Sequence, residues 1–170
     1  LPKKLSEKGY YTYITGKWHA MGNKAQEIFD KTGSIQPGQL KTYNADAGHI
    51  TDITGIEAVN FIKNYNKDKP FFAYVAFNAP HVPRQTTQNY YDLYPSDQIK
   101  LPPSFSDKMP LNTNVKYQYA PNPLRKKTMQ NRVQQNNAMV SHMDARIGDI
   151  INALKEKGIY DNTLIVFTSD

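Results

Sequence analysis

The sequence predicts an α/β fold in which helices flank a largely parallel sheet. Segments with helical and strand character alternate along the chain in the order helix, strand, helix, strand, helix, strand. Residues 71–77, Phe-Phe-Ala-Tyr-Val-Ala-Phe, form a nearly continuous apolar run of strand length, which is typical of a strand buried on both faces of a parallel sheet. Because parallel strands joined by crossover helices all point the same way, we expect the strands to end at one edge of the sheet.

The composition indicates a folded domain without cysteine chemistry. The 170 residues are enough for one domain with a sizeable core, and 39% of them are apolar. The lack of cysteine excludes disulfides, thiolate metal sites and a cysteine nucleophile within this chain. No apolar run is long enough to cross a membrane, so we expect no membrane span. The net charge of +6 suits an anionic partner, but the basic residues are scattered, and we expect no nucleic-acid partner.

The chain is expected to begin with a helix and a strand, followed by a long loop. Residues 1–8 are typical of the end of a helix, and Gly9 is suited to cap it. Residues 10–15 are rich in aromatic and β-branched side chains, which favours a strand, and Gly16 lets the chain turn sharply after it. Residues 20–49 contain several glycines and little periodicity, so we expect a long irregular loop there.

A second helix is expected to start near residue 50. Apolar residues recur at steps of three and so share one broad helical face. They are Ile50, Ile53, Ile56, Val59, Ile62 and Tyr65. Thr51 and Asp52 are candidates for the N-cap, and Asp68-Lys69-Pro70 ends the helix before the apolar strand at 71–77.

A long helix and a third strand complete the pattern. Apolar residues at three- and four-residue steps predict a helix over residues 128–157, and Gly158 ends it. His142 and Asp144 lie near the apolar seam of this helix, where we favour structural hydrogen bonds over a functional role. Residues 163–168 form another apolar run and predict a further buried strand.

The chain is expected to form a single partial domain over residues 1–170. Residues 1–83 and 128–170 supply the α/β layers, and the proline-rich residues 84–127 form an irregular excursion near a substrate cleft. Three tyrosines in this excursion either stack on a sugar ring or pack the loop, and we favour packing. They are Tyr90, Tyr91 and Tyr94.

Four side chains with ionic or acid–base chemistry follow directly after the predicted strands. They are Lys17, His19, His81 and Asp170. Each by itself has an ordinary alternative as a solvated loop residue, whereas their shared position after strands favours one common site. A cation, two imidazoles and a carboxylate suit a tetrahedral oxyanion, either sulfate or phosphate. A nucleophile is the part that this set lacks.

Several motifs occur in a specific order over nearly the whole chain. They are Gly9-Tyr10 with Gly16-Lys17-Trp18-His19, Pro70-Phe71-Phe72 with Pro80-His81-Val82-Pro83, Asp144-Ala145-Arg146-Ile147-Gly148, and the run from Asp161 to Asp170. Together they resemble the type I sulfatases of the alkaline-phosphatase-like superfamily. The resemblance implies that superfamily's fold, here incomplete, and hydrolysis of a sulfate ester. It also implies a formylglycine nucleophile made from Cys or Ser, and a calcium ion that stabilises the sulfate oxygens.

The resemblance assigns a role to each of the four side chains. Lys17 would contact the sulfate and the aldehyde hydrate, and His19 would bind the hydrate and assist its collapse. His81 would touch the sulfate or protonate the leaving alkoxide, and Asp170 would ligate calcium. The catalytic set is therefore Lys17, His19 and His81; Lys17 and His81 also bind substrate, and Asp170 is the metal ligand.

The departures from the family pattern predict an internal fragment. No Ser in the chain stands in a Ser-x-Pro-x-Arg motif, and the paired metal aspartates, a further Asn ligand and a second lysine are missing. We therefore expect this chain to be inactive by itself and its parent to be a calcium-dependent sulfatase. Residues 91–95 and 101–103 resemble sulfatases of sulfated carbohydrate. The family also implies a periplasmic, secreted or lysosomal location, although no signal peptide is visible at 1–4.

Two alternatives remain open at the level of sequence. A phosphate or phosphonate ester hydrolase of the same superfamily would act on an anion of the same shape, and an upstream Thr or unmodified Ser nucleophile would distinguish it. A non-catalytic domain that binds sulfated glycans would retain the fold, and binding without turnover would distinguish it.

Overall fold

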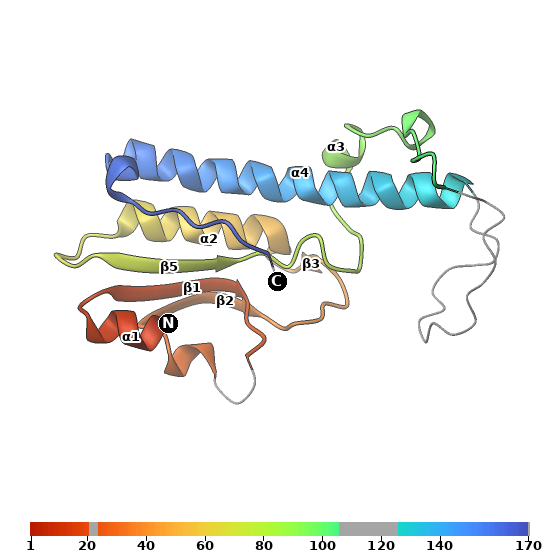
Figure 1. Cartoon of the computed structure of the whole chain (residues 1–170). Coiled ribbons are helices and arrows are strands. Elements are labelled where there is room, and N and C mark those ends of the chain that lie inside the picture. The colour runs from red at the N-terminus through yellow and green to blue at the C-terminus, as the bar shows by residue number, and fades with distance from the viewer. Residues whose placement is uncertain (21–23, 106–125, 170) are drawn as a thin grey trace.

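A computed structural model of the chain describes residues 1–20, 24–105 and 126–169. Its helices are α1 (Pro2–Glu7), α2 (Ile50–Asn64), α3 (Gln88–Tyr91) and α4 (Lys126–Glu156), with short 3-10 turns at Ala25–Glu27, Ser96–Gln98 and Tyr160–Asn162. Its strands are β1 (Tyr11–Lys17), β2 (Lys31–Gln36), β3 (Asn44–Ala45), β4 (Gly48–His49) and β5 (Phe71–Ala76). Figure 1 shows α2 lying along the sheet, with α4 running beside α2 on the side away from the strands. The predicted α/β architecture is confirmed.

The main sheet has the order β2-β1-β5, and both strand pairs are parallel. Gly16 of β1 lies opposite Ile35 of β2 and Ala76 of β5, so the carboxyl ends of all three strands share one edge. The central strand β1 is the best buried, with Tyr13 and Ile14 almost inaccessible to solvent. Parallel pairing and a shared edge are what the alternation of helices and strands predicts.

The core lies on both faces of this sheet. On one face Tyr13 stacks on Phe61 of α2 with ring centroids 4.1 Å apart, and Leu154 of α4 belongs to the same cluster. On the other face Ile14 packs with Phe29, near the first 3-10 turn. Each face therefore buries apolar surface, which is the dominant favourable contribution to folding.

The three helices expected from periodicity and capping are present. α1, α2 and α4 match the expected segments 1–8, 50–67 and 128–157 to within a few residues. The expected N-cap of α2 is wrong, because His49 occupies that position and its side chain accepts a hydrogen bond from Thr51 N–H. Imidazole is an uncommon cap, and the sequence rules favour Ser, Thr, Asp and Asn.

The expectation of an irregular loop over residues 20–49 is wrong. Strand β2 lies within that range, and it has little apolar periodicity because its side chains are only partly buried. Its order comes from backbone pairing with β1 and from Glu57 of α2, whose carboxylate accepts hydrogen bonds from Ser34 N–H at 2.7 Å and Ser34 Oγ at 2.6 Å. Both contacts are long-range, so a local reading of the sequence does not detect them.

Two expectations about buried strands are also wrong. Strand β5 is half-buried rather than buried on both faces, because it pairs only with β1 within the described residues and leaves Tyr74 43% exposed. Residues 163–168 form no strand, and Leu164 and Phe167 are 89% and 75% exposed. A strand needs a hydrogen-bonding neighbour, and no described strand pairs with these residues.

The part of the expected excursion that the structure describes, residues 84–105, has little regular structure. Between residues 84 and 105 the regular elements are α3 and one 3-10 turn, and residues 106–125 lie outside the described residues. The tyrosines pack, as favoured: Tyr90 stacks on His142 of α4, and Tyr94 Oη lies 2.6 Å from Ser141 Oγ. Among the described helices, none has the length and apolar character needed to cross a bilayer.

Candidate functional site at the carboxyl edge of the sheet

Lys17 is the last residue of β1 and stands at the carboxyl edge of the sheet. The preceding residue, Gly16, has φ of +93°, and a Cβ at that position would overlap Ala76 O of β5. Only glycine fits this close approach of two backbones. The β1–β2 register also shifts between Ile14 and Gly16. This irregularity directly before Lys17 sets the direction in which the chain leaves the sheet.

His19 follows two residues later and is exposed to solvent. Its ring packs against the segment after β2, because a Cβ on Gly38 would lie 2.5 Å from His19 Nδ1. The intervening Trp18 packs edge-on against Phe29 and Tyr74, with centroids 5.6 and 6.4 Å away. Trp18 therefore covers the end of the core, while His19 remains accessible.

His81 lies in the segment after β5 and is exposed. Its backbone N–H donates to Asn78 O at 2.9 Å, and its Nδ1 lies 2.7 Å from Val82 O. Because a carbonyl oxygen only accepts, Nδ1 is protonated in this contact and Nε2 is available for chemistry. The buried Oη of Tyr43 donates to His81 O at 2.9 Å, which fixes the backbone there.

The structure brings three of the four expected residues to one edge of the sheet. Lys17 ends β1 and His19 follows it, and His81 follows the neighbouring parallel strand β5. The expected metal ligand, Asp170, lies outside the described residues. Convergence of side chains beyond the carboxyl ends of parallel strands is the usual place for a ligand in an α/β fold.

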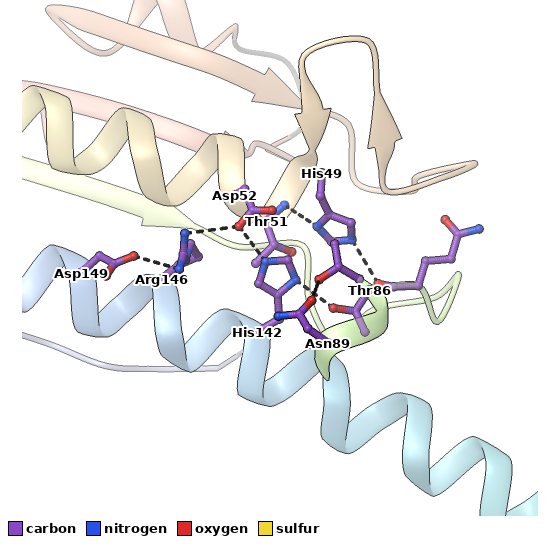
Figure 2. Close-up of polar contacts among 10 residues, drawn as sticks. His49, Thr51, Asp52, Thr86, Asn89, His142, Arg146 and Asp149 are labelled. Carbon is purple, nitrogen blue, oxygen red and sulfur yellow. Dashed lines mark hydrogen bonds and ion pairs between the residues drawn. The ribbon is translucent and has the colours of Figure 1, made fainter. Parts of the chain in front are cut away.

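A second polar group lies behind this edge, between α2, α4 and the segment after β5 (Figure 2). His142 Nε2 lies 2.7 Å from Asp52 Oδ1, and His142 Nδ1 lies 2.8 Å from Thr86 Oγ1. His49 Nε2 lies 3.3 Å from Gln85 O. His142 is 1% exposed, so the structural hydrogen bonds expected for it are present.

The hydrogen bonds determine the state of His49. Its Nδ1 accepts from Thr51 N–H at 3.3 Å, and its Nε2 faces a carbonyl oxygen, which requires a proton on Nε2. Burial lowers the pKa of His49, and the neighbouring His142 lowers this pKa further. Both effects disfavour the charged form of His49, so this imidazole is neutral with Nε2 protonated.

His49, Asp52 and His142 offer ligand atoms that all lie within 4.8 Å of one another. Two imidazole nitrogens and one carboxylate oxygen do not fit calcium, which takes six to eight oxygen ligands. Both ring nitrogens of each histidine already contact protein atoms, and Arg146 Nη1 lies 3.4 Å from Asp52 Oδ1. The cluster is therefore a hydrogen-bonded network whose ligand atoms do not fit calcium.

Sequence reasoning did not single out His49, Tyr43 or Asn78. Asn78 is 5% exposed, its Nδ2 donates to Pro37 O at 3.2 Å, and its Oδ1 finds no donor among the described residues. The position of Asn78, two residues after the end of β5, was an available signal. The His49 cap of α2 is a local contact, but the capping rules do not favour histidine. Nothing local indicates that Tyr43 reaches His81, because those residues are 38 positions apart.

Comparison with known proteins assigns the chain to a family. The sulfatase family model matches residues 1–170. A sulfatase from Formosa agariphila is 30% identical over 154 residues, covering 82% of this chain and 30% of that protein. The solved structure of Ps i-CgsB in complex with k-i-k-neocarrahexaose has a TM-score of 0.63 and 25% identity, covering 95% of this chain and 37% of that one.

A further solved structure, BT4656 in complex with its substrate D-glucosamine-2-N,6-O-disulfate, has a TM-score of 0.66 and 22% identity, which supports the fold alone. This chain spans less than half the length of these relatives. The match nevertheless extends from the first residue to the last and includes the strand ends that hold Lys17, His19 and His81. The chain therefore belongs to the sulfatase family.

Proposed function

We propose that the protein that contains this chain hydrolyses sulfate esters of carbohydrate. The observation that supports this most directly is the sheet edge that Lys17 and His81 share. Lys17 ends β1, His81 follows the adjacent parallel strand β5, and the ends of these two strands are in register. The sulfatase family model matches all 170 residues, which favours sulfate as the anion that these side chains bind. Together they favour a sulfate group over the phosphate group that the same side chains would suit.

The proposed roles follow from the chemistry of each side chain. The Lys17 ammonium binds the sulfate oxygens and offsets the negative charge of the transition state. The protonated form of His81 Nε2 donates a proton to the leaving sugar oxygen, which would otherwise depart as an alkoxide. His19 is exposed and lies two residues after Lys17. It would hold the free hydroxyl of the sulfated nucleophile and take its proton as the sulfate leaves and the aldehyde re-forms.

The proposal includes a formylglycine nucleophile and calcium, both contributed mainly by residues beyond those described. Formylglycine supplies a hydrated aldehyde as the nucleophile, and the chain itself has no cysteine or suitably placed serine for this role. Asp170 is proposed as one calcium ligand. An exported location, periplasmic, secreted or lysosomal, is part of the same proposal. We accordingly expect the 170-residue chain alone to release no sulfate.

Carbohydrate is the proposed substrate class for two reasons. Ps i-CgsB and BT4656, which share the fold, are bound to neocarrahexaose and to a disulfated glucosamine. A partly buried Lys17 and the exposed His19 and His81 at this sheet edge also suit a polar, anionic substrate better than an apolar one.

The test is sulfate release by the full-length protein from a panel of sulfated sugars, such as glucosamine 6-sulfate and carrageenan oligosaccharides. We expect turnover of at least one member, and a loss of about 10²-fold or more in kcat for His81→Ala, because positioned acid–base groups contribute that much. Lys17→Ala is expected to lose about 10²-fold or more because an anion-stabilising group is removed.

Lys4→Ala is the matched control, because it removes an exposed lysine from α1, which directly precedes the other end of β1. It should leave turnover unchanged. Release of phosphate from the corresponding phosphate esters, without release of sulfate, would favour the phosphatase alternative. Tight binding of sulfated glycans with no turnover would favour a binding domain.

A further inference from the structure

Four rings form a continuous stack beside the carboxyl edge of the sheet. Tyr43 stacks on His49 with centroids 5.4 Å apart, and His49 lies 4.7 Å from His142. His142 stacks on Tyr90 of α3 with centroids 4.4 Å apart. The ring stack, defined as Tyr43, His49, His142 and Tyr90, therefore joins the segment before β3 to α2, α4 and α3.

Every member of the ring stack except Tyr90 also makes a polar contact with residues 81–86. Tyr43 Oη donates to His81 O at 2.9 Å. His49 Nε2 lies 3.3 Å from Gln85 O, and His142 Nδ1 lies 2.8 Å from Thr86 Oγ1. The segment that contains His81 is thus held at its start by Tyr43 and at its end by the two buried histidines. Figure 2 shows the contacts at its end.

Asp52 fixes the ring stack in turn. Its carboxylate accepts a hydrogen bond from His142 Nε2 at 2.7 Å and lies in the first turn of α2, where negative charge is favourable. With Nε2 used by Asp52, Nδ1 is the atom that His142 presents to Thr86. Asp52 therefore orients the imidazole that holds Thr86.

We propose that the ring stack and Asp52 position His81, with the His142–Thr86 hydrogen bond as the link that holds the end of its loop. The expected effect on kcat rests on the proposed function, in which His81 is a catalytic residue. His142 and Thr86 are positioning residues, since neither touches the substrate. The alternative is a buried polar cluster that only stabilises the fold.

The geometry favours positioning over simple packing. If these four side chains only filled space, their shape alone would matter. Apolar side chains of similar volume would then serve as well, without the free-energy cost of burying polar groups. Here the polar atoms of Tyr43, His49 and His142 face one loop, at three separate points along it. A displacement of about 1 Å in a catalytic group can cost about 10²-fold in rate, so such anchoring has a kinetic effect.

Thr86 offers a matched pair of variants for the test in the full-length protein. Thr86→Val retains the shape and removes the hydroxyl, whereas Thr86→Ser retains the hydroxyl. We expect Thr86→Val to lower kcat about ten-fold with KM changed less than about two-fold, because the substrate-binding groups are untouched. Thr86→Ser is expected to stay within about two-fold of the parent in both constants.

A double-mutant cycle with His81→Ala tests whether the effect passes through His81. If it does, Thr86→Val has no further effect on the residual rate of His81→Ala. Equal ten-fold losses in both backgrounds would overturn the proposal, as would equal activity of the Val and Ser variants.

Hydrogen exchange of the peptide covering residues 79–87 gives a readout that does not depend on turnover. We expect Thr86→Val to raise the exchange rate of this peptide several-fold. Ile62→Val, which destabilises the core cluster around Phe61, should leave its exchange unchanged. Unchanged exchange in Thr86→Val overturns the positioning proposal. A parent protein that releases no sulfate counts against the proposed function alone, and the exchange measurement still decides the anchoring.

Discussion

Gly16 shows how one residue without a side chain determines the site. The sequence indicates a turn at this glycine, whereas the structure continues β1 through it to Lys17. Its positive φ and the close approach of Ala76 O, which leaves no room for a Cβ, explain why no larger residue fits. Lys17 is brought to the sheet edge by this backbone geometry.

Gly16→Ala is expected to lower the free energy of unfolding by about 2 kcal/mol or more, because it adds a backbone clash to an unfavourable φ. Urea denaturation followed by circular dichroism measures the change. Gly148→Ala is the control, since a Cβ there meets nothing within 4 Å and Gly148 lies inside α4. That variant should gain about 0.5–1 kcal/mol. A loss of stability in Gly148→Ala equal to that in Gly16→Ala would contradict this account.

At the scale of elements, Glu57 joins α2 to two strands. Its carboxylate accepts hydrogen bonds from Thr15 Oγ1 of β1 at 2.5 Å and from the backbone and side chain of Ser34 in β2. The pKa of Tyr13 is raised to about 12, first by burial of its hydroxyl and second by the negative charge of Glu57. A single acidic side chain thus holds a helix against an edge strand that has little apolar surface of its own.

Glu57→Ala is expected to destabilise the fold by about 2–3 kcal/mol, because it leaves the Ser34 N–H and two hydroxyls without their charged acceptor. The control is Glu156→Ala, which removes an exposed ion pair with Lys63 and should cost less than about 1 kcal/mol. Thermal unfolding of both variants measures the difference. Similar losses would show that Glu57 contributes no more than a surface charge does.

The elements differ in how well the sequence predicts them, for a physical reason. α2 and α4 each bury one apolar face, so their period of about 3.6 residues is visible in the chain. β2 is mostly polar and is ordered by pairing with β1 and by Glu57, neither of which is local. Residues 163–168 have strand composition but no described partner, so composition alone predicts a strand that the structure does not form.

At the scale of the whole molecule, the apolar run after α4 lies on the surface. Leu164 is 89% exposed, Val166 75% and Phe167 75%. Figure 1 shows this C-terminal segment running back past α2 toward the carboxyl ends of the strands. Contiguous exposed apolar side chains with strand composition favour self-association.

We therefore expect Leu164→Lys combined with Val166→Lys to reduce aggregation of the 170-residue chain, with its unfolding midpoint unchanged. Light scattering at increasing protein concentration measures the effect. Gln26→Lys with Gln98→Lys is the control, because it adds the same charge at exposed positions elsewhere. If both pairs reduce scattering equally, net charge rather than the apolar segment controls solubility.

By itself, the sequence determined the fold class, both long helices, β1, β5 and the family, because these depend on local periodicity and on motifs that are contiguous in the chain. It also identified Lys17, His19 and His81 as residues at strand ends, although the structure places Lys17 inside β1 as its last residue. Only the tertiary structure decided that Glu57 orders β2 and that a stack of rings holds the loop of His81. Those contacts join residues that are far apart in the chain, and no local pattern encodes which of them meet.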